Sequence, residues 1–88
     1  YVRLVNQNSG KDVVVRGASR DAGAKLIQYS YEPNADTNDE WLLEDAGNGR
    51  YRLANRFSGL YLTMPSAQGA QVEQRAYDGS GRQAFTIA

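Results

Sequence analysis

The sequence predicts an all-β chain built from two copies of a four-stranded unit. Three observations support this fold class: a repeat runs along the whole chain, the apolar runs are short and rich in β-branched residues, and turn signals separate these runs. No window of ten or more residues carries the apolar stripe of a helix. Short strands with regularly spaced turn signals are typical of a barrel or a sandwich.

The repeat consists of three segments that recur in the same order. The matching segments are residues 2–10 and 51–59, residues 23–31 and 69–77, and residues 39–43 and 83–87. In the first match, five of the nine positions are identical. The offset shrinks from 49 to 46 to 44 residues, which indicates that the second copy has lost short loop insertions. We place repeat one at residues 1–49 and repeat two at residues 50–88, within a single domain.

Each copy is expected to form four strands. They are placed near residues 2–6, 12–16, 25–30 and 40–44 in repeat one, and near residues 51–55, 60–64, 71–76 and 84–87 in repeat two. The run Val13-Val14-Val15 favours a strand because β-branched side chains fit a pleated surface. Segments such as Asn8-Ser9-Gly10 and Gly47-Asn48-Gly49 are typical of turns.

Composition excludes several classes of function. The charges of ten basic and ten acidic residues cancel, whereas a nucleic-acid binder needs a basic surface, so this class of function is not expected. No stretch approaches the roughly 20 apolar residues of a membrane span. The chain has no Cys and no His, so the usual nucleophile–base pairs and zinc sites cannot form. We therefore predict a protein that is not an enzyme and that uses no cofactor and no metal.

A cluster of carboxylates between Asp36 and Asp45 is the one feature that could suggest catalysis. Glycoside hydrolysis needs two carboxyl groups on either side of the scissile bond. These residues all fall in one predicted loop and strand, and no second acidic group faces them from elsewhere in the sequence. The cluster does not change the non-enzymatic prediction.

At this point the motifs resemble ricin-B-type lectin repeats. The first copy reads Asn6-Gln7-Asn8-Ser9-Gly10-Lys11-Asp12-Val13-Val14-Val15, then Gly23-Ala24-Lys25-Leu26-Ile27-Gln28-Tyr29, then Asn38-Asp39-Glu40-Trp41. Each copy ends in a version of the Q-x-W box of this family, with Asp39 replacing Gln in copy one and Phe85 replacing Trp in copy two. The resemblance covers essentially the whole chain.

The resemblance implies a β-trefoil, in which three four-stranded repeats surround a pseudo-threefold axis. Two of the three repeats are present in this chain. Because such repeats are stabilised by stacking on their neighbours, we expect a third repeat, an attached domain or a partner chain to complete the fold. The resemblance also implies that Trp41 and Phe85 pack in the core. Tyr31 and Tyr77, with Asp12 and Tyr61, stand where relatives have disulfide cysteines, and we expect them to replace those bridges by packing.

The resemblance further implies a shallow sugar pocket in each repeat, with an Asp, an Asn and an aromatic ring that stacks on the sugar. In copy one the aromatic position is Tyr29 and the Asn position is Asn38, but the Asp position is Val14. The candidate sugar-binding residues are Tyr29, Asn38 and the adjacent Asp39. Tyr29 can instead be a half-buried strand residue, and Asn38 can instead cap a turn.

The corresponding positions of copy two are Thr63, Arg75 and Arg82, which offer no ring for stacking. This second pocket is expected to be degenerate. The leading hypothesis is a secreted, lectin-like module that binds a glycan or polysaccharide with weakened affinity. The alternative is a β-trefoil used as a protein-interaction or inhibitor scaffold, which the absence of the usual Asp at positions 14 and 63 favours.

Overall fold

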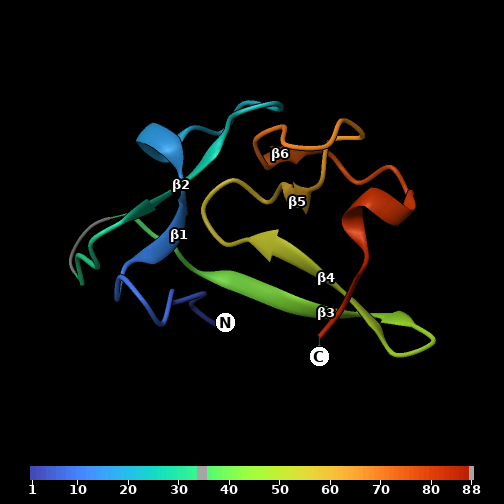
Figure 1. Cartoon of the computed structure of the whole chain (residues 1–88), viewed down its shortest axis with the longest axis horizontal. Helices are drawn as coiled ribbons and strands as arrows, with labels where there is room; N and C mark the ends of the chain where they lie inside the picture. The colour runs from blue at the N-terminus through green and yellow to red at the C-terminus, as the bar shows by residue number, and fades with distance from the viewer. Residues whose placement is uncertain (34–35, 88) are drawn as a thin grey trace.

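The computed structural model of the chain describes residues 1–33 and 36–87, and Figure 1 shows an assembly of short strands with two single-turn 3-10 helices. The elements are β1 (Asp12–Val15), η1 (Arg16–Ala18), β2 (Leu26–Tyr29), β3 (Trp41–Gly47), β4 (Arg50–Asn55), β5 (Tyr61–Thr63), β6 (Glu73–Arg75), η2 (Gly81–Gln83) and β7 (Phe85–Thr86). The described residues contain no longer helix. The all-β prediction is confirmed.

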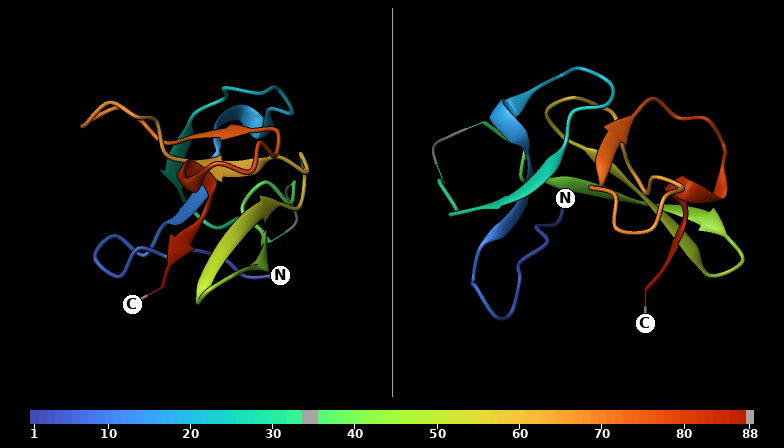
Figure 2. Two further views of the ribbon diagram at one scale, coloured as in Figure 1. Left: turned by 90° about the vertical axis from the view of Figure 1, so that its right-hand side faces the viewer. Right: turned by 45° about the horizontal axis from the view of Figure 1, so that its top comes forward.

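The strands form two antiparallel sheets. β1 pairs with β2, while β3, β4, β5 and β6 pair in that order and β7 adds to β4. The long β3–β4 hairpin crosses from repeat one into repeat two and connects the β1–β2 hairpin to β5, β6 and η2 (Figure 2). Its turn needs positive φ angles at three successive residues: 84° at Gly47, 55° at Asn48 and 76° at Gly49. Glycine and asparagine tolerate this left-handed conformation best, which explains the Gly-Asn-Gly sequence.

The internal repeat is visible in the hydrogen bonds. Each repeat contains the same network of an Asn, a Ser and a Gln: Asn6, Ser9 and Gln28 in repeat one, and Asn55, Ser58 and Gln74 in repeat two. The Asn Oδ1 accepts from backbone N–H groups two and three residues further on, at 2.8 and 3.0 Å in repeat one and at 3.1 and 3.1 Å in repeat two. The Ser hydroxyl donates to the Gln Oε1 at 2.8 and 2.7 Å respectively.

The strand predicted at residues 2–6 is wrong in extent. This segment forms only two isolated bridges, between Val2 and Trp41 and between Val5 and Asp12. Its counterpart β4 pairs along its length with β3, which belongs to the preceding repeat. Within residues 1–33 and 36–87, no strand occupies the equivalent position beside residues 2–6, so this segment lacks the neighbour that makes β4 regular.

The other predicted strands are present with different ends. β3 extends to Gly47, beyond the predicted residue 44, because it forms the long hairpin with β4. Three strands of repeat two are shorter than predicted, with β5 at 61–63, β6 at 73–75 and β7 at 85–86. Residues just outside β6 bond through single contacts, such as Leu26 N to Val72 O at 2.9 Å, instead of through a regular ladder.

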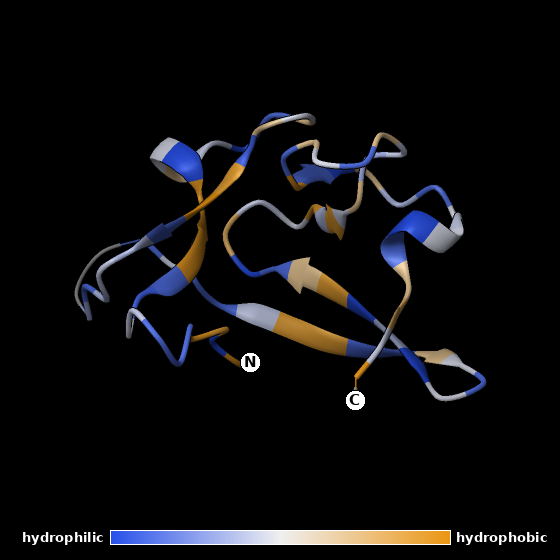
Figure 3. Cartoon of the chain, in the orientation of Figure 1, coloured by the Kyte–Doolittle hydropathy of each residue, from blue (hydrophilic) through white to orange (hydrophobic). Residues whose placement is uncertain are grey.

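The core lies between the β1–β2 hairpin and the larger sheet. Its buried members are Val15, Leu26, Trp41, Leu53 and Leu62, and the apolar residues of β1 and β2 stand out in Figure 3. Trp41 is fully buried, and its indole N–H donates to the Val13 carbonyl at 3.3 Å. Phe85 packs against the core but is only half-buried. It lies in a two-residue strand whose ladder partner is β4.

On one side the core is open. A cavity of about 330 Å³ is lined by apolar side chains and one amide: Leu4, Val13, Leu26, Ile27, Gln28, Leu62 and Val72. Five of these residues, from both repeats, belong to the core cluster or pack against it. The two repeats therefore share a core that they do not fully enclose.

Two contacts occupy the positions that the resemblance assigns to disulfides. In repeat two the rings of Tyr61 and Tyr77 lie 5.6 Å apart at 57°. In repeat one the Arg3 guanidinium donates to both Asp12 carboxylate oxygens, at 2.9 and 3.1 Å, and lies 3.7 Å from the centroid of the Tyr31 ring. Aromatic packing in repeat two and an ion pair with a cation–π contact in repeat one thus connect the segments that disulfides would otherwise link.

Candidate functional site

A second cavity, of about 280 Å³, opens on the surface of repeat one between η1, β2 and the segment that leads into β3. It is lined by Val14, Gly17, Ala18, Ile27, Tyr29, Ser30, Glu32, Asp36, Asn38 and Asp39. We call it the repeat-one pocket. The three residues predicted to bind sugar, Tyr29, Asn38 and Asp39, all lie in this lining.

Strand alternation explains the floor of the repeat-one pocket. Val14 and Ile27 are register partners in the β1–β2 hairpin, and successive side chains of a strand point to opposite faces. Val15 and Leu26 therefore enter the core, while Val14 and Ile27 line the pocket. Val14, at the position where the resemblance places an Asp, makes this floor apolar.

Tyr29 lies two residues after Ile27 and on the same face of β2. Its side chain is exposed, at 53 % of its full accessible area, so it is not a packing residue of the core. An exposed tyrosine ring beside an apolar floor offers a flat surface on which the C–H face of a sugar can stack. The structure places Tyr29 at the rim of the pocket.

Asn38 holds the segment before β3 against β1. Its Nδ2 donates to the Val15 carbonyl at 2.8 Å, while the Val15 N–H donates to the Asn38 carbonyl at 3.3 Å. The Asn38 carbonyl also accepts from Asn55 Nδ2 at 2.9 Å. Among the described residues no group donates to the Asn38 amide oxygen, which leaves an acceptor at the pocket. Asn38 thus has a structural bond and one free acceptor.

Asp39 is a nearly buried acid in the pocket lining, at 8 % exposed. Burial raises the pKa of the Asp39 carboxyl, and a hydrogen bond to the Asp12 carboxyl and the negative charge of Asp12 raise that pKa further. Asp12 in turn accepts both hydrogen bonds of the Arg3 guanidinium. Two carboxyl groups and one guanidinium therefore stand side by side beneath the pocket.

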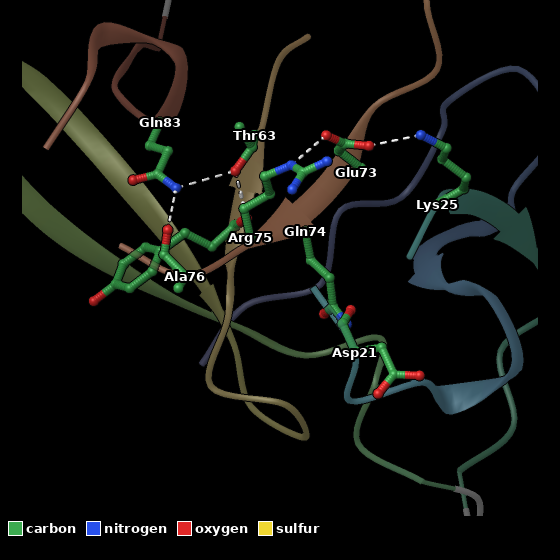
Figure 4. Close-up of polar contacts among 9 residues, drawn as sticks. Asp21, Lys25, Thr63, Glu73, Gln74, Arg75, Ala76 and Gln83 are labelled. Atoms are coloured by element: carbon green, nitrogen blue, oxygen red, sulfur yellow. Dashed lines mark hydrogen bonds and ion pairs between the residues drawn. The ribbon is translucent and has the colours of Figure 1, made fainter. Parts of the chain in front are cut away.

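In repeat two, side chains that bond to one another occupy the corresponding positions (Figure 4). Gln83, fully buried, donates from Nε2 to Thr63 Oγ1 at 3.2 Å and to the Ala76 carbonyl at 2.9 Å, and its Oε1 accepts from the Asp78 N–H at 3.0 Å. Thr63 occupies the position of Val14, and its hydroxyl donates to the Tyr61 carbonyl at 2.9 Å. These polar groups satisfy each other.

Glu73 forms ion pairs with two cations at the same place. Its carboxylate accepts from Lys25 Nζ at 2.6 Å and from Arg75 Nε at 2.6 Å, as drawn in Figure 4. These two hydrogen bonds hold the pKa of the Glu73 carboxyl below its usual range. Arg75 stands where repeat one has Tyr29, so the aromatic platform is replaced by half of an ion pair.

Sequence reasoning missed part of the pocket wall. Gly17 and Ala18 reach it because both have positive φ angles, 64° and 51°, which turn the chain after β1. A Gly-Ala pair is a weak turn signal, so it gave no indication of this role. Asp36 belongs to the carboxylate cluster seen in the sequence, whereas no sequence pattern singled out Glu32, and both residues line the pocket beside β2.

The arrangement of two copies, the shared core and one surface pocket can be compared with known proteins. The family described as ricin-type β-trefoil lectin domain-like matches residues 1–75 and, in a second overlapping match, residues 38–88. This chain belongs to that family. The overlapping matches of this ricin-type chain span both repeats.

Solved structures agree with this membership. The designed threefold-symmetric protein ThreeFoil matches with a TM-score of 0.88 and 39 % identity, over 96 % of this ricin-type chain and 61 % of ThreeFoil. 1,3Gal43A, an exo-β-1,3-galactanase from Clostridium thermocellum, matches with a TM-score of 0.87 and 28 % identity, over 96 % of this chain and 18 % of the galactanase. The β-trefoil prediction is confirmed. A comparison with curated proteins gives no match.

Two further findings concern the described residues as a group. None of their helices is long and apolar enough to cross a membrane. They contain no group of three or more acidic, His or Cys side chains arranged to hold a metal ion.

Proposed function

We propose that the repeat-one pocket binds a glycan and that the protein acts as a lectin-like module without catalysis. The observation that supports this proposal best is the exposed Tyr29 ring at the rim of a pocket that also presents the Asn38 amide and the Asp39 carboxyl. A flat ring beside a few acceptors is what a pyranose needs, because it has an apolar face and a perimeter of hydroxyl donors. The glycan partner implies work outside the cell, as a secreted protein.

The composition of the pocket determines its expected strength. Val14 supplies an apolar floor at the position where a carboxylate would otherwise accept from sugar hydroxyls. Losing one charged acceptor removes a hydrogen bond worth about 1.5–3 kcal/mol. The proposed pocket is therefore expected to bind a single sugar with low affinity, and this binding depends on stacking of the sugar against Tyr29.

The test is a glycan array followed by calorimetry on the chain and on Tyr29→Ala. We expect Tyr29→Ala to lose at least about tenfold in affinity, because removing the ring removes the stacking surface. The melting temperature should hardly change, since Tyr29 is exposed. Tyr1→Ala is the matched control: Tyr1 is 65 % exposed and does not line the pocket, so glycan binding should be kept.

A protein that binds nothing on a broad array would contradict the proposal. The interaction-scaffold alternative would then replace it. An affinity that falls equally in Tyr29→Ala and Tyr1→Ala would also contradict it, because the ring at the pocket would have no special role.

The proposal includes a partner for the fold itself: a third repeat, of the same kind, on the open side of the core. The contacts between the two repeats show what such a neighbour offers. Gln74, fully buried, donates from Nε2 to the carbonyls of Ser19 and Asp21 at 3.0 and 3.0 Å. Asn55, also buried, donates to the carbonyl of Asn38 at 2.9 Å.

The counterparts of these two residues in repeat one are Gln28 and Asn6, and both are exposed. Their side-chain Nδ2 and Nε2 groups donate to no described residue. Gln28 also lines the open apolar cavity. Repeat one therefore presents the same amide donors on its outer face, beside the open part of the core. A further repeat that presents the same backbone carbonyls fits this face.

Light scattering on the 88-residue chain tests this partner. Open apolar surface and unpaired strand edges promote association, so we expect the chain alone to form oligomers. Appending a copy of residues 1–49 should give a monomer with a sharper and higher thermal transition. A monomeric, sharply melting 88-residue chain would contradict the need for a third repeat.

A further inference from the structure

The charged side chains that line the repeat-one pocket all have one sign. Its lining contains three carboxyl groups, those of Glu32, Asp36 and Asp39, and no Lys or Arg. The counterpart in repeat two has the opposite character, because Arg75 and Arg82 stand where repeat one has Tyr29 and Asn38. The repeat-one pocket and its counterpart in repeat two are thus equivalent in the fold, but they would accept ligands of different charge.

Asp39 is the most buried of these three carboxyl groups. Its side chain is more than nine-tenths buried and it lines the pocket. Apart from its own backbone N–H, no donor within residues 1–33 and 36–87 bonds to this carboxyl, and its side-chain partner is another acid, Asp12. The Arg3 guanidinium makes two hydrogen bonds to Asp12 and acts on Asp39 through its charge, so the two carboxyl groups share one cation.

Two adjacent buried carboxyl groups that share one cation are unfavourable when both are charged, and a ligand that brings a second cation relieves this cost. Such a ligand gains a charge-assisted hydrogen bond, which is about twice as strong as a neutral one. Tyr29 adds to the attraction, since an ammonium group near a tyrosine ring is stabilised by the negative face of the ring. A uronic acid or sialic acid, in contrast, would bring its own negative charge towards three carboxyl groups.

We propose that the repeat-one pocket selects sugars that carry a free, protonated amine, with the ammonium group paired to Asp39. This inference rests on the proposed glycan binding and adds the chemical class of the ligand. The preferred class is a hexosamine with an unmodified amino group. The N-acetylated form loses the charge and is bound less well, and acidic sugars are excluded.

The test compares sugars that differ in charge and share their ring stereochemistry. Calorimetry or NMR titration at neutral pH is run with galactosamine, N-acetylgalactosamine, galactose and galacturonic acid, and again with the glucose series. We expect the amine to bind about tenfold more tightly than the neutral sugar, as a charge-assisted hydrogen bond provides. The uronic acid should bind more weakly than the neutral sugar. Added salt should reduce the preference for the amine.

Two variants locate the effect. In Asp39→Asn the ratio of amine to neutral affinity should fall to about one, since the paired charge is gone. Asp21→Asn removes the same charge from an exposed side chain outside the pocket lining, and the ratio should stay as in the unmodified chain. A ratio that falls equally in both variants would overturn the pairing with Asp39, because it would reflect net charge alone.

The outcomes separate this inference from the proposed function. Neutral and amino sugars that bind equally well to the unmodified chain would overturn the amine preference and leave glycan binding in place. This comparison needs no variant, so it stands even where Asp39→Asn fails to fold. If no sugar of either series binds, glycan binding and the amine preference are both overturned.

Discussion

Replacing Gln74 with leucine removes the polar link between the repeats at nearly constant side-chain volume. Gln74 makes three hydrogen bonds: it donates to the carbonyls of Ser19 and Asp21 and accepts from the Ser58 hydroxyl at 2.7 Å. A typical intramolecular hydrogen bond contributes about 0.5–1.5 kcal/mol. The exposed Asp21 segment can regain water, whereas the Ser58 hydroxyl is partly enclosed. We expect Gln74→Leu to lower the free energy of unfolding by about 2–3 kcal/mol.

Gln28→Leu is the matched control for this prediction. Gln28 occupies the same position in repeat one, but it is exposed and makes one hydrogen bond, accepting from the Ser9 hydroxyl at 2.8 Å. Its replacement should lower the free energy of unfolding by less than about 1 kcal/mol. Urea denaturation monitored by the fluorescence of the single tryptophan, Trp41, measures both variants. Equal losses, or a loss below about 1 kcal/mol for Gln74→Leu, would refute the assigned role of Gln74.

Three further changes test other parts of the fold. Trp41→Ala should lower the free energy of unfolding by about 3–5 kcal/mol, because it empties the centre of the shared core; a thermal melt measures this, and a loss below about 1 kcal/mol would contradict the packing. The ion pairs lower the pKa of Glu73 in the folded chain, so they stabilise the fold above the unfolded pKa of 4.5, and this stabilisation is lost as the pH falls below that value. Melting temperatures measured from about pH 7 to about pH 3 should therefore fall less in Glu73→Gln than in the unmodified chain. Gly47→Ala should cost about 1–2 kcal/mol in a urea titration, since φ at this position is 84°, and an unchanged midpoint would show that the turn relaxes.

The parts of the fold that could be predicted from the sequence are those encoded by local pattern. The β-branched run at Val13–Val15, the Gly-Asn-Gly turn and the repeated Asn-x-x-Ser-Gly segment each specify their own conformation, and they are all found in place. The ends of the strands depend on neighbours in space. Residues 2–6 have the sequence of β4 but lack its partner strand, and no property of their own sequence shows this.

The candidate site follows the same division. The positions of Tyr29, Asn38 and Asp39 in the repeat motif predicted that they lie at one site, and all three line the same pocket. The prediction works because each residue lies at a fixed offset from a strand that does form. Their role in sugar binding stays a prediction. The bond from Asn38 to Val15 and the burial of Asp39 against Asp12 could not be predicted, since they join residues 23 and 27 positions apart in the chain.

The hydrogen bonds that join one segment to the next in this chain use the backbone at the position that would contact a ligand. Asn38 accepts from the Val15 N–H through its carbonyl, and Arg82, its counterpart, accepts from the Met64 N–H in the same way, at 2.9 Å. The side chain at this position can therefore change from amide to guanidinium while the fold keeps its bond. If the side chain at this position contacts a ligand, as proposed, the number of binding pockets can differ between trefoils of this type while this backbone bond is kept. Because linked sites can multiply overall affinity by about 10²–10⁴, single substitutions at such positions would tune avidity without any change of architecture.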